Sequence, residues 1–114
     1  MTIVKYDEVL LSGLEDRIRE SKQQKIFTVI HHWGIHGRSY HTIYPKIFEV
    51  YKPVCKSFEL NQCTDNELIN AYDNTIIFTN SFIASTIKIL YELKTSKMQI
   101  YITDHGQSLG EYRL

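Results

Sequence analysis

The longest periodic pattern in the sequence covers residues 64–93, and it constrains the fold more than any other feature. Residues 64–67 read Thr-Asp-Asn-Glu, a capping box in which the first and fourth residues satisfy each other's backbone N–H groups at the start of a helix. The pattern predicts one helix from there to about Leu93. Its expected apolar face consists of Leu68, Ile69, Tyr72, Ile76, Ile83, Ile87 and Leu90.

Shorter elements are expected before and after this helix. Residues 25–31 are rich in Ile, Phe and Val and predict a strand buried on both faces, which ends at Trp33-Gly34. Residues 98–103 predict a second strand. Residues 7–22 show a helical period, weakened by Gly13, and residues 32–62 predict a long irregular loop with a short helical turn near 45–50.

The order strand, helix, strand predicts a βαβ unit, in which the two strands lie parallel and are joined by a right-handed crossover. Ligands of parallel α/β sheets lie beyond the carboxyl ends of the strands. The first strand leads into His31, His32 and His36, and the second leads into Asp104 and His105. The two groups are therefore expected at one edge.

Asp104 and His105 are the strongest candidates for metal ligands. Neighbouring side chains of a strand point to opposite faces, so both can reach one ion only if the chain leaves the strand there, which Gly106 permits. A carboxylate with an imidazole suits zinc or a similar divalent ion. The alternative is a turn in which the aspartate caps a helix and the histidine is solvated.

Bulk composition narrows the function. With 114 residues the chain forms at most one small domain. Because Lys+Arg (13) and Asp+Glu (13) balance, no basic field is available to bind nucleic acid. No run of 18 or more apolar residues indicates a transmembrane segment, and the first residues do not resemble a secretion signal.

The two cysteines, Cys55 and Cys63, are eight positions apart in a polar loop. This spacing allows a small disulfide ring, two reduced thiols, or half of a metal site.

Three stretches together resemble a known family. Residues 104–111 read Asp-His-Gly-Gln-Ser-Leu-Gly-Glu, which resembles the Asp-His-Gly-Glu-Ser-Leu-Gly-Glu signature of the phosphoethanolamine transferases that modify lipid A and related envelope glycans. Residues 27–37 resemble that family's strand ending in Gly-x-His-Gly, and residues 70–75 resemble its Asn-x-Tyr-Asp-Asn-Thr helix. The family is a branch of the alkaline phosphatase and sulfatase superfamily.

The resemblance implies an α/β fold, a partial alkaline-phosphatase-like α/β sandwich with parallel strands and a long crossover helix. It implies that Asp104 and His105 bind a catalytic zinc, that His36 faces the phosphoryl group, and that Cys55 and Cys63 form a disulfide in the periplasm. The implied donor is phosphatidylethanolamine, and the implied acceptor is lipid A or a similar glycan. The family's catalytic domain is periplasmic and anchored in the inner membrane.

The sequence departs from the family at several positions. Arg38 stands in place of a proline, Gln107 in place of a glutamate and Lys5 in place of a cysteine. The family's Thr nucleophile and a Glu zinc ligand lie upstream of the matched positions. Residues 1–114 are therefore expected to be a single piece of a catalytic domain, truncated at both ends and inactive alone. The alternatives are a sulfatase or phosphodiesterase of the same superfamily, or a non-catalytic remnant that acts as a binding module.

Overall fold

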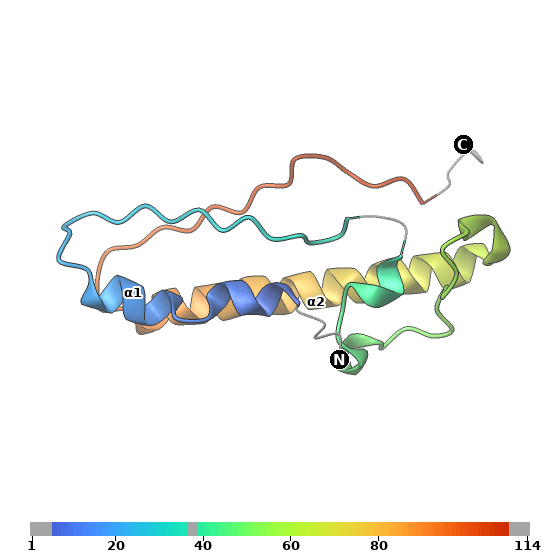
Figure 1. Ribbon diagram of the computed structural model, residues 1–114, viewed down its shortest axis with the longest axis horizontal. Helices are drawn as coiled ribbons and strands as arrows, with labels where there is room; N and C mark the ends of the chain where they lie inside the picture. The colour runs from blue at the N-terminus through green and yellow to red at the C-terminus, as the bar shows by residue number, and fades with distance from the viewer. Residues whose placement is uncertain (1–5, 37–38, 110–114) are drawn as a thin grey trace.

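The computed structural model describes residues 6–36 and 39–109. A long helix, α2, runs the length of the molecule, and the shorter helices lie against it (Figure 1). In chain order the elements are η1 (Asp7–Leu11), α1 (Leu14–Glu20), η2 (Tyr40–Thr42), η3 (Lys46–Phe48), η4 (Leu60–Gln62) and α2 (Asp65–Glu92), the η elements being 3₁₀ helices.

Helix α2 begins at the predicted capping box. The Thr64 hydroxyl accepts a hydrogen bond from the Glu67 N–H at 3.2 Å, and the Glu67 carboxylate accepts one from the Thr64 N–H at 2.8 Å. These backbone and hydroxyl hydrogen bonds lower the pKa of Glu67, and its negative charge lies at the positive end of the helix dipole. The predicted start and the end near Leu93 are both confirmed.

The predicted apolar face of α2 is correct only in part. Leu68 is buried and Tyr72 packs on the core cluster, as predicted, but Ile69, Ile76 and Ile87 are 43%, 43% and 55% exposed. The buried residues of the helix are Leu68, Ala71, Asn74, Thr75, Phe78, Thr79, Phe82 and Thr86. Threonine can be buried here because the hydroxyls of Thr75 and Thr86 donate to carbonyl oxygens three residues earlier, at 2.6 and 2.7 Å.

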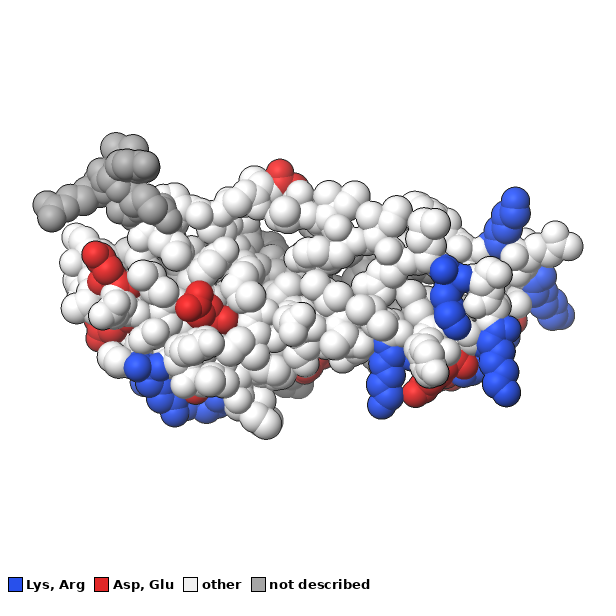
Figure 2. All heavy atoms as spheres, turned by 180° about the vertical axis from the view of Figure 1, so that it is seen from behind, with Lys and Arg blue, Asp and Glu red and all other residues white. Residues whose placement is uncertain are grey.

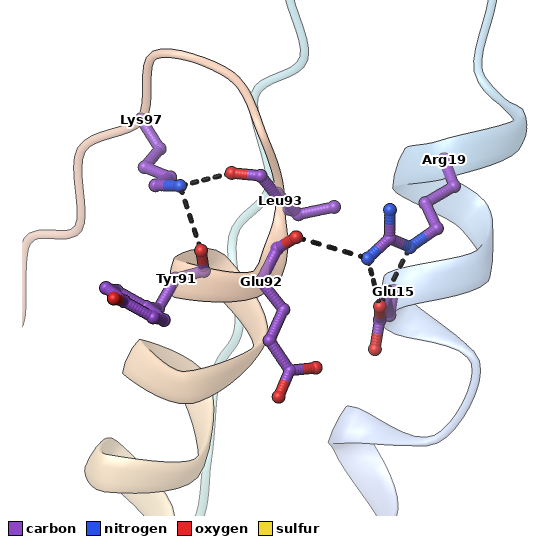
Figure 3. Close-up of polar contacts among 6 residues, drawn as sticks. All are labelled: Glu15, Arg19, Tyr91, Glu92, Leu93 and Lys97. Atoms are coloured by element: carbon purple, nitrogen blue, oxygen red, sulfur yellow. Dashed lines mark hydrogen bonds and ion pairs between the residues drawn. The ribbon is translucent and has the colours of Figure 1, made fainter.

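The C-terminal end of α2 has no basic residue in its own last turn. Lys97, which follows the helix, donates to the carbonyl oxygens of Tyr91 and Leu93, and Arg19 of α1 donates to that of Glu92 at 3.3 Å (Figure 3). Cations from two other parts of the chain therefore satisfy carbonyl groups at the negative end of the helix dipole.

The helix predicted over residues 7–22 is divided into two short ones. Gly13, at φ +71°, adopts the left-handed conformation between η1 and α1. Ser12 before it is extended, so the helical backbone ends at Leu11 and begins again at Leu14. The result is an N-terminal arm of two short helices that lies along α2 (Figure 1).

The two predicted strands are present only as extended chain. Residues 22–36 and 94–109 run in the same direction over α2 (Figure 1), but the described residues contain no strand, and no backbone hydrogen bond joins the two segments there. The burial on both faces that was expected of residues 25–31 is also wrong, since Phe27 is 91% and Val29 74% exposed. Two parallel segments covered on one side make a marginal sheet, because parallel pairing is weak per residue and such sheets need cover on both faces.

The loop between the first extended segment and α2 contains the three short 3₁₀ helices, one of them (η3) at the predicted helical turn. Asn74 of α2 is fully buried and holds this loop with all of its hydrogen-bonding capacity. Its Oδ1 accepts from the N–H groups of Val50 and Tyr51 at 3.0 and 2.9 Å. Its Nδ2 donates to the Tyr51 carbonyl oxygen and the Tyr44 hydroxyl, at 2.9 and 3.3 Å.

Further along the loop, Cys55 and Cys63 form a disulfide, with 5.6 Å between their Cα atoms. Val54, beside it, belongs to the hydrophobic core cluster with Tyr40, Leu68 and Ala71. Ile35 of the first extended segment and Leu109 of the second pack against the same cluster. The far ends of both segments are therefore fixed over the N-terminal half of α2.

The molecule is elongated and thin, with principal extents of 54 × 35 × 21 Å. On its rear face, Lys and Arg side chains gather toward the two ends and the middle is mainly uncharged (Figure 2). This face therefore offers no continuous basic surface for a polyanion. Within the described ranges, no helix is both long enough and apolar enough to cross a membrane.

Candidate functional site

A stack of aromatic rings sets the two extended segments in register. The His32 ring lies nearly parallel to the Tyr101 ring, with 5.7 Å between centroids, and packs on Phe82 of α2 at 5.1 Å. Four residues further along each segment, the rings of His36 and His105 meet at 6.1 Å. Equal spacing in two segments that run the same way thus brings together two side chains far apart in sequence. The meeting is the predicted one, but it occurs between extended segments and not at the edge of a sheet.

His105 is prepared to bind a cation through Nε2. Its Nδ1 lies 2.7 Å from the Gly106 carbonyl oxygen. A carbonyl can only accept, so Nδ1 carries the proton and the Nε2 lone pair is available. Backbone carbonyls commonly orient metal-binding histidines in this way.

The Asp104 carboxylate lies next to that nitrogen, with 3.8 Å from Oδ2 to His105 Nε2. Two ligand atoms about 2.1 Å from a tetrahedral zinc are about 3.4 Å apart, so a small side-chain rotation would place both on one ion. The two side chains are 88% and 52% exposed and can be reached from solvent. Their chemistry and spacing fit zinc.

Two ligands do not complete a catalytic zinc site, which normally has three from protein. Among the residues that the structure describes, no cluster of three or more His, Cys, Asp or Glu side chains could hold a metal ion. His36 is therefore a neighbour of the pair and not its third ligand in this arrangement.

The His36 side chain is exposed and lies edge-on to the Trp33 ring, with 5.0 Å between ring centroids. Trp33 is itself 68% exposed. Between them lie Gly34, at φ +61°, and Ile35, which packs on the core. The histidine is thus presented to solvent beside His105 by a short, fixed turn.

Asp7 was not predicted to contribute to the site, yet it holds this turn. Its carboxylate accepts from the N–H groups of Trp33 and Gly34 at 3.1 and 2.8 Å, and lies 3.3 Å from His32 Nδ1. The contact spans 25 to 27 residues, so no local motif could have revealed it.

The two remaining histidines of the chain, His31 and His41, take no part in the described contacts of the pair. His31 is exposed, and His41 packs against Phe58 with 6.1 Å between ring centroids. Burial lowers the pKa of His41, and nearby Lys56 lowers it further, which favours the neutral imidazole. Gln107 is partly buried, while Arg38 and Lys5 lie outside the described residues.

Comparison with known proteins identifies the family of the chain. The model of the Sulfatase family matches residues 4–114, and the chain belongs to this family. Among similar proteins, phosphoethanolamine transferase EptA of Helicobacter pylori is 40% identical over 109 residues, which are 96% of this chain and 21% of that protein. The chain spans about a fifth of the length of the curated relatives that it matches. The resemblance seen in the sequence motifs is confirmed.

Two solved structures share the fold. The soluble domain of lipooligosaccharide phosphoethanolamine transferase A from Neisseria meningitidis is 28% identical, with a TM-score of 0.79 over 94% of this chain and 32% of that one. The C-terminal periplasmic domain of phosphoethanolamine transferase EptC from Campylobacter jejuni is 36% identical, with a TM-score of 0.70 over 77% of this chain and 28% of that one. Both neighbours are domains of phosphoethanolamine transferases.

Proposed function

We propose that this chain contributes part of the active site of a zinc-dependent phosphoethanolamine transferase. The observation that carries the proposal is the Asp104–His105 pair, in which Nε2 of the histidine is left free by the Gly106 carbonyl and lies 3.8 Å from the carboxylate. The similarity to EptA proteins supports it. The donor is phosphatidylethanolamine, and the acceptor is lipid A or a related envelope glycan.

Each residue has a distinct task in this proposal. Asp104 and His105 hold the metal, and the chemistry that bound zinc supplies in such sites is activation of a hydroxyl nucleophile and stabilisation of phosphoryl charge. His36, presented beside His105, donates a hydrogen bond or a proton to a phosphoryl oxygen. The Trp33 ring beside it limits the directions from which water reaches the imidazole.

The disulfide supports a periplasmic setting, because such bonds persist in oxidising compartments. In the resembled family the Thr nucleophile and the Glu ligand precede the segment that this chain matches. We therefore expect the 114-residue chain alone to bind zinc weakly and to show no turnover.

Zinc titration by calorimetry tests the proposal directly. Asp104→Ala and His105→Ala should each weaken zinc binding at least 10-fold, since either leaves a single ligand. Asp16→Ala and His31→Ala are matched controls, because they remove an exposed aspartate and an exposed histidine away from the pair and should leave binding unchanged. Equal binding by all four variants would refute the site and favour the non-catalytic remnant.

A transferase assay tests the second expectation, that the 114-residue chain alone shows no turnover. The purified chain is incubated with a fluorescent phosphatidylethanolamine, lipid A and zinc, and the labelled products are separated. Zinc-dependent transfer or phosphodiester hydrolysis, abolished in Asp104→Ala, would overturn the expectation that the chain is inactive alone.

A further inference from the structure

The Asp7 carboxylate is enclosed by three hydrogen-bonding groups of the turn that precedes His36. Oδ1 accepts from the Trp33 N–H at 3.1 Å, and Oδ2 accepts from the Gly34 N–H at 2.8 Å and lies 3.3 Å from His32 Nδ1. The side chains of Asp7 and His32 are each only 15% exposed. A carboxylate that accepts several N–H groups away from bulk water makes strong, directional contacts.

The same carboxylate also fixes a ring that joins three parts of the fold. The His32 imidazole contacts Phe82 of α2 and Tyr101 of the second extended segment. It also lies against Gly34 so closely that a Cβ there would come within 2.9 Å of the ring. Asp7 therefore holds the first extended segment against both α2 and the second segment.

His36 lies two residues after Gly34, whose N–H donates to the Asp7 carboxylate. The intervening Ile35 packs on the core cluster, so the chain is fixed on both sides of Gly34. The Trp33 ring, whose backbone is held by the carboxylate, lies edge-on to the His36 ring at 5.0 Å. The position of His36 thus depends on a turn in which the N–H groups of Trp33 and Gly34 both donate to the Asp7 carboxylate.

We propose that Asp7 is a positioning residue that places His36 beside His105. It acts through the Trp33–Gly34 backbone and the His32 ring, and touches neither the metal pair nor substrate. The assignment of a catalytic task to His36 rests on the proposed function, but the placement itself does not. In Asp7→Asn the amide nitrogen must face one of the three groups, and because it cannot accept a hydrogen bond, the turn loosens.

The single tryptophan of the chain provides the measurement. The His36 ring lies edge-on to the indole and shields part of it from a neutral quencher, so the acrylamide quenching constant of Trp33 at fixed pH reports this contact. His36→Ala should raise the quenching constant. If that variant leaves the quenching constant unchanged, Trp33 and His36 are not in contact and the proposal is wrong.

Asp7→Asn should raise the quenching constant by at least half as much as His36→Ala does. Glu8→Gln, which removes an exposed carboxylate on the same 3₁₀ helix, is the matched control and should keep the quenching constant of the unaltered chain. An unchanged quenching constant in Asp7→Asn would overturn the positioning role. So would a parallel loss of α2 helicity by circular dichroism, since Asp7 would then stabilise the whole fold.

Zinc titration of the same variants separates this proposal from the proposed function. Asp7→Asn should bind zinc within 3-fold of the unaltered chain, because Asp104 and His105 lie on the other segment. Fluorescence requires neither zinc nor substrate, so absence of zinc binding would remove the proposed function and leave the placement of His36 standing. A zinc affinity that falls together with the fluorescence change would show that Asp7 acts on both segments and would overturn a role specific to His36.

Discussion

Asn74→Ala should be the most damaging single polar substitution in α2. The change removes the acceptor for the Val50 and Tyr51 N–H groups and the donor to the Tyr51 carbonyl and the Tyr44 hydroxyl. Val50 and Tyr51 are 61% and 47% exposed, so water can partly replace the lost partner and each unsatisfied N–H costs toward the low end of about 1–3 kcal/mol.

Together, the lost hydrogen bonds should lower the free energy of unfolding by about 2–4 kcal/mol. Alanine offsets roughly 0.5 kcal/mol of this loss, because it favours the helix more than asparagine does. Urea unfolding followed by circular dichroism at 222 nm measures this change in the free energy of unfolding. With a slope of about 2 kcal/mol/M for a chain of this size, the midpoint should fall by roughly 1–2 M.

Asn80→Ala is the matched control, since Asn80 is exposed on the same helix and its replacement should leave the midpoint unchanged or slightly higher. A midpoint for Asn74→Ala within 0.3 M of the unaltered chain, about the error of such a comparison, would refute the idea that this side chain anchors the loop.

Two further predictions concern the loop and the turn. Reduction of the Cys55–Cys63 bond should lower the free energy of unfolding by about 2.5 kcal/mol, as loop entropy gives for so short a ring; unfolding curves that coincide with and without reductant would contradict this. Gly34→Ala should destabilise the chain more than Gly13→Ala. Both glycines have positive φ, but only at Gly34 would the new Cβ lie against the His32 imidazole. Gly106→Ala should have little effect on stability, because a Cβ there meets open space and the residue has no positive φ. Equal thermal midpoints for the three glycine variants would show that the steric argument fails.

Local signals in the sequence predicted local structure well. The capping box at Thr64 needs only four neighbouring residues, and the structure contains it with both reciprocal hydrogen bonds. The meeting of His36 with the Asp104–His105 segment could also be predicted, because it follows from the order of elements and the shared direction of two extended runs.

The buried face of α2 could not be predicted from apolar spacing. Isoleucine is ordinarily counted as buried and asparagine as exposed, yet here Ile76 is 43% exposed and Asn74 is fully buried. The difference arises because Asn74 satisfies the backbone of a distant loop and Thr75 satisfies its hydroxyl within the helix, so both can replace apolar side chains at the interface.

The remaining errors concern interactions between distant segments. A β-type composition predicts an extended chain, but a hydrogen-bonded ladder depends on the number of neighbouring strands and on cover for both faces. The role of Asp7 depends on contacts that cross at least 25 residues, for which a single sequence gives no signal.

The register set by the His32–Tyr101 stack implies a rule about chain length. Both segments have the same number of residues between the stacked rings and the site histidines, and the first segment turns at Gly34 within that stretch. One inserted residue between His32 and His36 would therefore lengthen a turn that is fixed on both sides, and would move the imidazole by about 3.3 Å, the length of one extended residue. Homologues of different length should place their insertions in the surface loop around Phe58 and keep the count between stack and site unchanged, whatever side chains fill it.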